Sequence, residues 1–245
     1  AGVLTPVAGY FKAVREVCDR HGVLLILDEV MCGMGCCGTL HAFEPEGVVP
    51  DLLTIAKGLG GGFPIGAFWV RDRHADLLGP GTHATTFGGT PLGCAVALKI
   101  LDVIERDNLA NNVRNTGEFL KSELQRIADT YPSVLTRVRG LGFMLGFELR
   151  DKNDIPTLAG SDKASSLQVV NRLHEAGVLT IPSGAQVVRL LPALNLPRVP
   201  DSPSLTSAAS SPATAPAVQP VEPLAVEKVL YNLGLQSNLA GLIRQ

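Results

Sequence analysis

The sequence lacks any apolar run that approaches the roughly 20 residues a membrane-spanning helix needs. It also begins without the charged and then apolar pattern of a secretory signal peptide. Positive charge is not in excess, since 21 Lys and Arg stand against 23 Asp and Glu for a net charge of −2. We therefore expect neither a membrane partner nor a nucleic-acid partner, because both usually leave an apolar or basic signature.

Cysteine is scarce and unevenly placed: of five in 245 residues, three crowd at Cys32, Cys36 and Cys37. This is no spaced disulfide framework, so we expect an intracellular protein, with cytoplasm and mitochondrial matrix both open. Charged residues make up only 18% of the chain, against about 25% in ordinary soluble domains, which favours a surface partly covered by another subunit. The first methionine is Met31, so we expect a chain that is processed or cut from a longer protein.

Apolar strand-like runs alternate with helical periodicity along the first half of the chain. We expect a helix over residues 6–21 and strands over Val23–Leu27, Leu52–Ala56 and Gly66–Val70. This alternation predicts an α/β fold with a largely parallel sheet. Ligands bind such sheets at the carboxyl ends of the strands, which is where Asp28 and Lys57 fall.

The second half of the chain begins with two long helices, expected over Pro91–Arg106 and about Leu109–Ala128. The stretch 137–149 predicts a glycine-punctuated strand pair, Ser165–Ala176 a helix, and 187–196 a strand with its exit. Residues 197–223 are rich in Pro, Ala and Ser and carry almost no large apolar side chain, so we expect them to be disordered.

Asp28 raises a chemical question because it ends the apolar run "VLLILDEV". A buried acid beside a buried lysine can be an internal ion pair that fixes two strands. The same pair also suits pyridoxal phosphate, whose aldehyde forms a Schiff base with a lysine. A carboxylate beside the ring nitrogen of this cofactor would favour its protonated form, which draws electrons from the substrate.

Five blocks of sequence favour the cofactor. They are "LLILDEV", "PDLLTIAKGLGGGFPIGAF", "HATTFGGTPLGCAVALKILDVIE", "RGLGFMLGFEL" and "VVRLLPALNL". In this order they resemble the second half of the class III pyridoxal-phosphate aminotransferases, most closely the acetylornithine aminotransferase group, over about residues 1–196. The resemblance implies fold type I, with part of the large cofactor-binding domain at 1–108 and a smaller α+β domain at 109–245.

The resemblance also implies roles for five positions. Lys57 matches the lysine that binds the cofactor and shuttles a proton, Asp28 the partner of the ring nitrogen, and Val30 the residue on the ring face. Thr86 matches a threonine that binds the phosphate of the neighbouring subunit's cofactor, and Arg189 the arginine that grips the substrate's α-carboxylate. Without the resemblance, Val30 would be an ordinary core valine, Thr86 a turn threonine and Arg189 a salt-bridged strand arginine.

The implied reaction moves an amino group from an ω-amine such as N-acetylornithine to 2-oxoglutarate, in a homodimer with shared active sites. Ornithine and 4-aminobutyrate are alternative amino donors. The chain also departs from the family: Met31 stands where Gln is usual, and Gly35-Cys36-Cys37-Gly38 where Gly-Arg-Thr-Gly is usual. The family's phosphate-binding loop and ring-stacking aromatic lie upstream of residue 1.

Two alternatives from other classes remain. A non-catalytic paralogue would account for Met31 and the cysteines and would pair with a complete subunit. A zinc site built by Cys32, Cys36, Cys37 and His41 uses ligands of suitable softness, although their spacing matches no zinc pattern.

Overall fold

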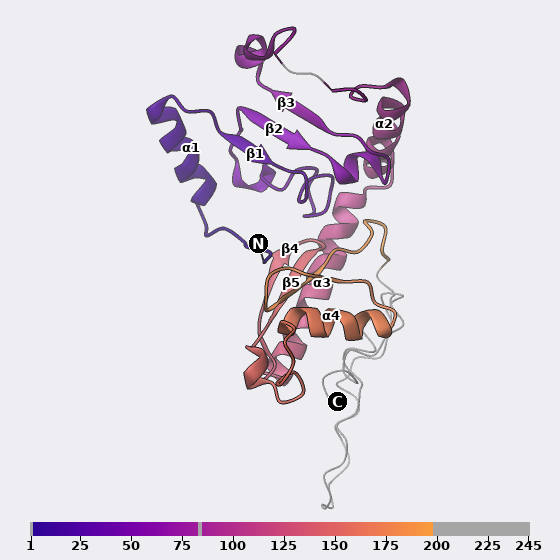
Figure 1. The fold of residues 1–245 in the computed structure, drawn as a ribbon. Coiled ribbons are helices and arrows are strands. Elements are labelled where there is room, and N and C mark those ends of the chain that lie inside the picture. Colours follow the sequence, from indigo (N-terminus) through magenta and orange to yellow (C-terminus); the bar gives the residue numbers. More distant parts are fainter. Residues whose placement is uncertain (1, 83–84, 198–245) are drawn as a thin grey trace, which may run out of the picture.

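The computed structural model of the chain describes residues 2–82 and 85–197. Its helices and strands up to residue 106 are α1 (Tyr10–His21), β1 (Ile26–Asp28), η1 (Glu44–Glu46), β2 (Leu52–Ile55), η2 (Lys57–Gly60), β3 (Ala67–Val70), η3 (Asp72–Leu78) and α2 (Pro91–Arg106), where η marks a 3₁₀ helix. Those that follow are α3 (Leu109–Thr130), β4 (Leu135–Leu141), β5 (Met144–Leu149), η4 (Lys152–Asp154), α4 (Ser165–Glu175), β6 (Ile181–Pro182) and β7 (Val187–Leu190). Helices and two sheets share the chain (Figure 1), so the predicted α/β class is confirmed.

The first sheet has the strand order β1-β2-β3. Strands β1 and β2 are parallel, as predicted, but β3 runs antiparallel to β2, so the expectation of a largely parallel sheet is wrong for this pair. The physical reason lies in the connection, because a parallel return needs a crossover of a dozen or more residues, usually with an α-helix. The chain from β2 to β3 makes only the short helix η2 and a glycine-rich turn.

Helix α1 and strand β1 both start later than predicted. Gly9 takes a left-handed conformation with φ 80°, so the helix begins at Tyr10 and the pair Thr5-Pro6 does not start it. At the other end Gly22 is left-handed, and the N–H of Val23 donates to the carbonyl of Cys18 at 2.9 Å. That bond closes the helix terminus, and the strand therefore starts at Ile26.

The second sheet has the order β4-β5-β7-β6, and its neighbouring strands are antiparallel. The predicted strand pair at 137–149 is confirmed as the hairpin β4–β5. The main hydrophobic core joins this sheet to α3 and α4, and it includes Leu120, Ile127, Leu145, Leu173 and Val188. Helix α2 has the predicted bounds, and the Thr90 side chain caps it by accepting a hydrogen bond from the N–H of Gly93 at 3.4 Å.

A buried ion cluster fixes the amino ends of β1 and β2. Asp51 is fully buried and accepts hydrogen bonds from the N–H of Leu25 at 2.9 Å, from Arg15 at 2.7 Å and from Arg73 at 2.6 Å. Burial alone would raise the pKa of Asp51, but these bonds outweigh it and hold that pKa well below its usual range. The charged form therefore ties α1, β1 and the exit of β3 together.

The predicted disordered segment 197–223, apart from residue 197, and the tail after it lie outside the described residues. None of the described helices is both long and apolar enough to cross a bilayer.

Candidate active site

Asp28 and Lys57 lie at the same edge of the first sheet. Asp28 is the last residue of β1 and pairs in register with Thr54 of β2, while Lys57 comes just after the end of β2. Because the two strands are parallel, their carboxyl ends bring both side chains to one edge, as the sequence predicted. Both residues are exposed, and no ion pair joins them within the described part of the chain, so the buried ion-pair alternative is not what forms there.

The backbone around Lys57 is unusual. Lys57 has φ 45°, a left-handed conformation that side chains other than glycine's seldom adopt. A Cβ on the next residue, Gly58, would lie 2.9 Å from the Cβ of Met34, so only glycine fits there. The Nζ of Lys57 contacts the Sδ of Met31. The turn after β2 thus directs the lysine toward the loop that follows β1.

That loop follows Asp28 directly and carries Val30 and Met31. The N–H of half-buried Val30 donates to Oδ1 of Asp28 at 2.9 Å, which fixes the carboxylate against its own backbone. Asp28 and Met31 line a cleft of about 700 Å³, whose wall on the second sheet is the strand β4; Lys57 and Arg189 do not line this cleft. The residues of that wall are Arg137, Val138, Arg139, Gly140 and Leu141. The two sheets therefore share a cavity beside Asp28.

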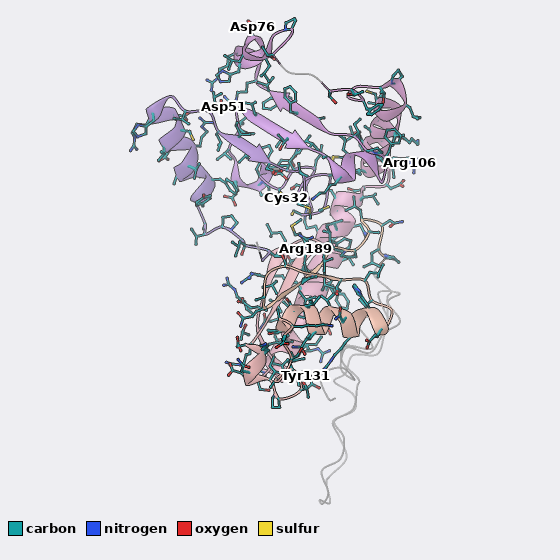
Figure 2. All side chains as sticks on the ribbon, viewed as in Figure 1. Cys32, Asp51, Asp76, Arg106, Tyr131 and Arg189 are labelled. Carbon is teal, nitrogen blue, oxygen red and sulfur yellow. The ribbon has the colours of Figure 1, made fainter. Side chains whose placement is uncertain are left out.

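Arg189 lies on β7, opposite Gly146 of β5 and Ile181 of β6. Its Nε is buried and has no hydrogen-bond partner among the described residues, and none of the ion pairs found there includes it. The expected alternative of a salt-bridged strand arginine is thus not observed in this part of the chain. In Figure 2, Arg189 lies where the second sheet approaches the first, below Cys32.

Thr86 is exposed, on the loop that leads into α2. The structure thus groups Asp28, Val30, Met31 and Lys57 at one sheet edge, puts Arg189 on the second sheet, and leaves Thr86 on a separate loop. A contact of Thr86 with the site of a neighbouring subunit stays a prediction.

The loop from residue 31 to residue 38, which follows β1 of the first sheet, packs against the second sheet. The N–H of Phe143, in the β4–β5 hairpin, donates to the carbonyl of Cys36 at 2.9 Å. A Cβ on Gly142 would lie 2.7 Å from the carbonyl carbon of Cys37, so the hairpin turn approaches this loop as closely as backbones allow. The cysteines that replace the family's usual Arg and Thr therefore lie at the junction of the two sheets.

The thiols in this loop are held in their protonated form. Burial raises the pKa of Cys32 to about 12, and the neighbouring carboxylate of Glu29 adds to the effect. Burial likewise raises the pKa of Cys37 to about 12. Among residues 2–82 and 85–197, no three His, Cys, Asp or Glu side chains are placed to hold a metal ion, so the zinc alternative has no ligand set there.

Two buried carboxylates in this region escaped the sequence prediction. Glu29 is 4% exposed and Asp51 is fully buried, and each owes its place to partners distant in the sequence. One feature of the sequence could have pointed to Glu29 as a site residue, because it directly follows Asp28, which the sequence analysis had selected. For Asp51 the only such feature was its position just before an apolar strand.

Comparison with known proteins gives a consistent result. The family description Aminotransferase class-III matches residues 1–198. An acetylornithine aminotransferase from Xylella fastidiosa is 44% identical over 195 residues, which make up 80% of this chain and 45% of that protein. The chain thus spans about half the length of the curated relatives it matches.

Solved structures agree with this match. The ornithine aminotransferase from Toxoplasma gondii superposes with a TM-score of 0.72 at 34% identity, over 80% of this chain and 44% of that one. The acetylornithine aminotransferase from Elizabethkingia anophelis gives a TM-score of 0.71 at 33% identity, over 79% and 46% of the two chains.

Proposed function

The chain belongs to the class-III aminotransferases, and we propose that it supplies the lysine-bearing half of a pyridoxal-phosphate site. The proposed reaction moves an amino group from an ω-amine such as N-acetylornithine to 2-oxoglutarate. The family implies this cofactor, together with amino-acid and oxo-acid substrates. The observation that carries the proposal is the placement of Asp28 and Lys57 at the carboxyl ends of neighbouring parallel strands.

The residues present fit the cofactor. A carboxylate and a lysine amine occupy one sheet edge, where Asp28 lines the cleft and Lys57 lies outside its lining. On the second sheet, the buried Nε of Arg189 has no hydrogen-bond partner among the described residues. When bound, pyridoxal phosphate supplies an electron-withdrawing ring that stabilises negative charge at the substrate carbon that carries the amino group. Lys57, Asp28, Val30 and Thr86 would hold the cofactor.

Lys57 has two tasks in this proposal. Its Nζ would anchor the cofactor between turnovers, and the freed amine would move a proton from the substrate's Cα to the C4′ carbon of the cofactor. The left-handed backbone at Lys57 and the tight packing of Gly58 on Met34 support both tasks, because they restrict where the amine can point.

Asp28 and Arg189 would each pair with an opposite charge, on the cofactor's ring and on the substrate respectively. The carboxylate of Asp28 holds a proton on the ring nitrogen by favouring its cationic form. The guanidinium of Arg189 binds the α-carboxylate of either substrate with two parallel hydrogen bonds. Its buried Nε, which has no partner among the described residues, leaves donor capacity for that carboxylate.

The arrangement of subunits and domains belongs to the same proposal. We place the large-domain portion at residues 1–108 and the small domain at 109–245. We propose a homodimer in which Thr86 binds the phosphate at the neighbouring subunit's site. The exposure of Thr86 on a separate loop supports this assignment.

Two other functions have specific support. Ornithine as amino donor is favoured by the superposition on the ornithine aminotransferase from Toxoplasma gondii. A non-catalytic paralogue is favoured by Met31, whose Sδ contacts the Nζ of Lys57 where the family usually has a glutamine amide.

The decisive experiment joins the chain to a complete amino-terminal half, adds pyridoxal phosphate and reduces with borohydride. Peptide mapping should find the cofactor on Lys57 alone, and Lys57→Ala should abolish the label. Lys99→Ala, which removes an exposed lysine of α2, is the control and should leave labelling unchanged. A cofactor attached elsewhere, or nowhere, would sink the assignment, and absence of turnover despite labelling would favour the non-catalytic paralogue.

A further inference from the structure

Glu29 is a buried acid that none of the assigned roles uses. It follows Asp28 directly and is 4% exposed, although charged side chains are seldom so buried without a partner. It also lines the 700 Å³ cleft beside Asp28 and Met31. A carboxylate costs free energy at such a depth, so the contacts it makes there require an explanation.

Those contacts close the loop that carries the site residues. The backbone N–H of Glu29 donates to the carbonyl of Thr54 at 2.9 Å, which extends the pairing of β1 with β2. Its carboxylate Oε1 accepts the N–H of Phe43 at 3.1 Å. Residue 29 therefore holds the end of β2 with its backbone and the far end of the loop with its side chain.

The start of the loop wraps tightly around the same residue. The N–H of Gly33 donates to the carbonyl of Glu29 at 3.0 Å. A Cβ on Gly33 would lie 2.7 Å from that carbonyl oxygen and 3.4 Å from Oε2. Glycine alone fits at this distance, so residues 29–33 are held in one shape around the carboxylate.

The carboxylate is only half satisfied. Oε2 of Glu29 is buried and has no hydrogen-bond partner among the described residues. The thiol of Cys32 donates to the backbone carbonyl of Asp28, at 3.6 Å. It also lies close enough to the carboxylate of Glu29 for a side-chain interaction, which adds to the effect of burial in raising the pKa of Cys32. Burial raises the pKa of Cys36, and the charge of Glu29 adds to that effect. Cys36 stands where the resembling sequences carry an arginine.

From this arrangement we propose that Glu29 is a positioning residue for Asp28. Its carboxylate, through the N–H of Phe43, fixes the loop from residue 29 to residue 43 and thereby the direction of the Asp28 side chain. The link to Asp28 is short, because Oδ1 of Asp28 accepts the N–H of Val30, the residue after Glu29. The part of this inference that concerns catalysis rests on the proposed function.

The test compares two substitutions in the chain joined to a complete amino-terminal half. Glu29→Gln keeps an oxygen that accepts the N–H of Phe43, so it should retain kcat within about threefold. Glu29→Met has a similar length but no acceptor, so kcat should fall by about tenfold or more. The KM of the amino donor should change little in both, because Arg189 binds the substrate from the second sheet. Glu118→Gln and Glu118→Met, at an exposed position of α3, are the matched controls.

The thermal midpoint separates positioning from a purely structural role. Glu29→Met removes a half-satisfied buried charge, so its Tm should stay within a few degrees of the parent while kcat falls. Loss of kcat in Glu29→Gln as large as in Glu29→Met would overturn the proposal, since it would show that the acceptor is not what matters. Unchanged kcat in Glu29→Met would overturn it equally.

A second readout does not depend on catalysis. Amide hydrogen exchange of the segment that contains Phe43 should be faster in Glu29→Met than in the parent, and should be restored in Glu29→Gln. Parent protein without turnover would contradict the proposed function, while the exchange data would still decide whether Glu29 anchors the loop. Parental exchange rates in Glu29→Met would show that it does not.

Discussion

The Nζ of Lys57 lies against the Sδ of Met31, across the edge where β1 and β2 end. A thioether is a weak acceptor and no donor, whereas the glutamine usual in the resembling sequences offers both. Met31, which stands where a glutamine is usual, is therefore in direct contact with Lys57.

Met31→Gln should strengthen cofactor binding. An amide at this position can donate to an oxygen of the cofactor, and a hydrogen bond to a charged group contributes about 1.5–3 kcal/mol. We expect the Kd for pyridoxal phosphate to fall by about tenfold, measured by absorbance titration. Met144→Gln, which also lies on the cleft, is the control. Equal effects of the two changes would show that general polarity of the cleft, and not a hydrogen bond from residue 31 to the cofactor, is responsible.

Asp28→Asn should leave the fold intact and cut turnover by about a hundredfold or more, because an amide no longer favours a protonated ring nitrogen. The carboxamide oxygen can still accept the N–H of Val30, so Tm should change little. Asp76→Asn, at an exposed position that lies far from the cleft residue Cys32 in Figure 2, should not affect kcat. Parental turnover in Asp28→Asn would make Asp28 a structural residue.

Arg189→Lys should raise the KM of the amino donor and of the oxo acid together by about tenfold, since both present a carboxylate to the same guanidinium. The matched control is Arg20→Lys, on the exposed surface of α1. Steady-state kinetics with each substrate varied in turn gives both constants. A rise confined to one substrate would contradict a shared carboxylate site.

The half-buried thiols of Cys32 and Cys37 should resist alkylation. At pH 8, iodoacetamide should modify exposed Cys94 well before Cys32 or Cys37.

The same thiols should lower the stability of the folded chain in alkali. The folded chain holds the Cys32 thiol at a pKa of about 12, above its ordinary value of 9.0, so it keeps a proton that the unfolded chain has lost. Stability is therefore fully present below pH 9 and falls between about pH 9 and pH 12.

Denaturation midpoints measured across this pH range check the thiol effect. Substituting Cys32 and Cys37 with alanine should flatten the alkaline decline, whereas Cys94→Ala should leave it unchanged. A decline of the same slope in all variants would assign it to other groups.

Much of the fold follows from local signals in the sequence. Helix α2 begins at Pro91 after the capping residue Thr90 and ends at Arg106, as predicted, because caps and periodicity are local. The edge shared by Asp28 and Lys57 was predictable for a similar reason, since it needs only two strands and their direction.

The rest depends on contacts between residues far apart in the sequence. Glu29 is placed by Phe43, and Asp51 by Arg15 and Arg73, and no local pattern announces such pairs. The direction of β3 was missed because a short connection outweighs the general preference for parallel strands. The relation of Thr86 to a second subunit stays a prediction.

The ion cluster around Asp51 makes tolerance to mutation unequal among its members. The two carboxylate oxygens accept bonds from several donors, so substitution of exposed Arg73 leaves the bonds from Arg15 and Leu25 in place. Substitution of Asp51 instead leaves the buried N–H of Leu25 without an acceptor and reduces the partners of Arg15 to exposed Asp19, at a cost of several kcal/mol. During evolution each arginine can therefore be substituted singly, whereas a substitution of Asp51 requires that its donors are substituted as well.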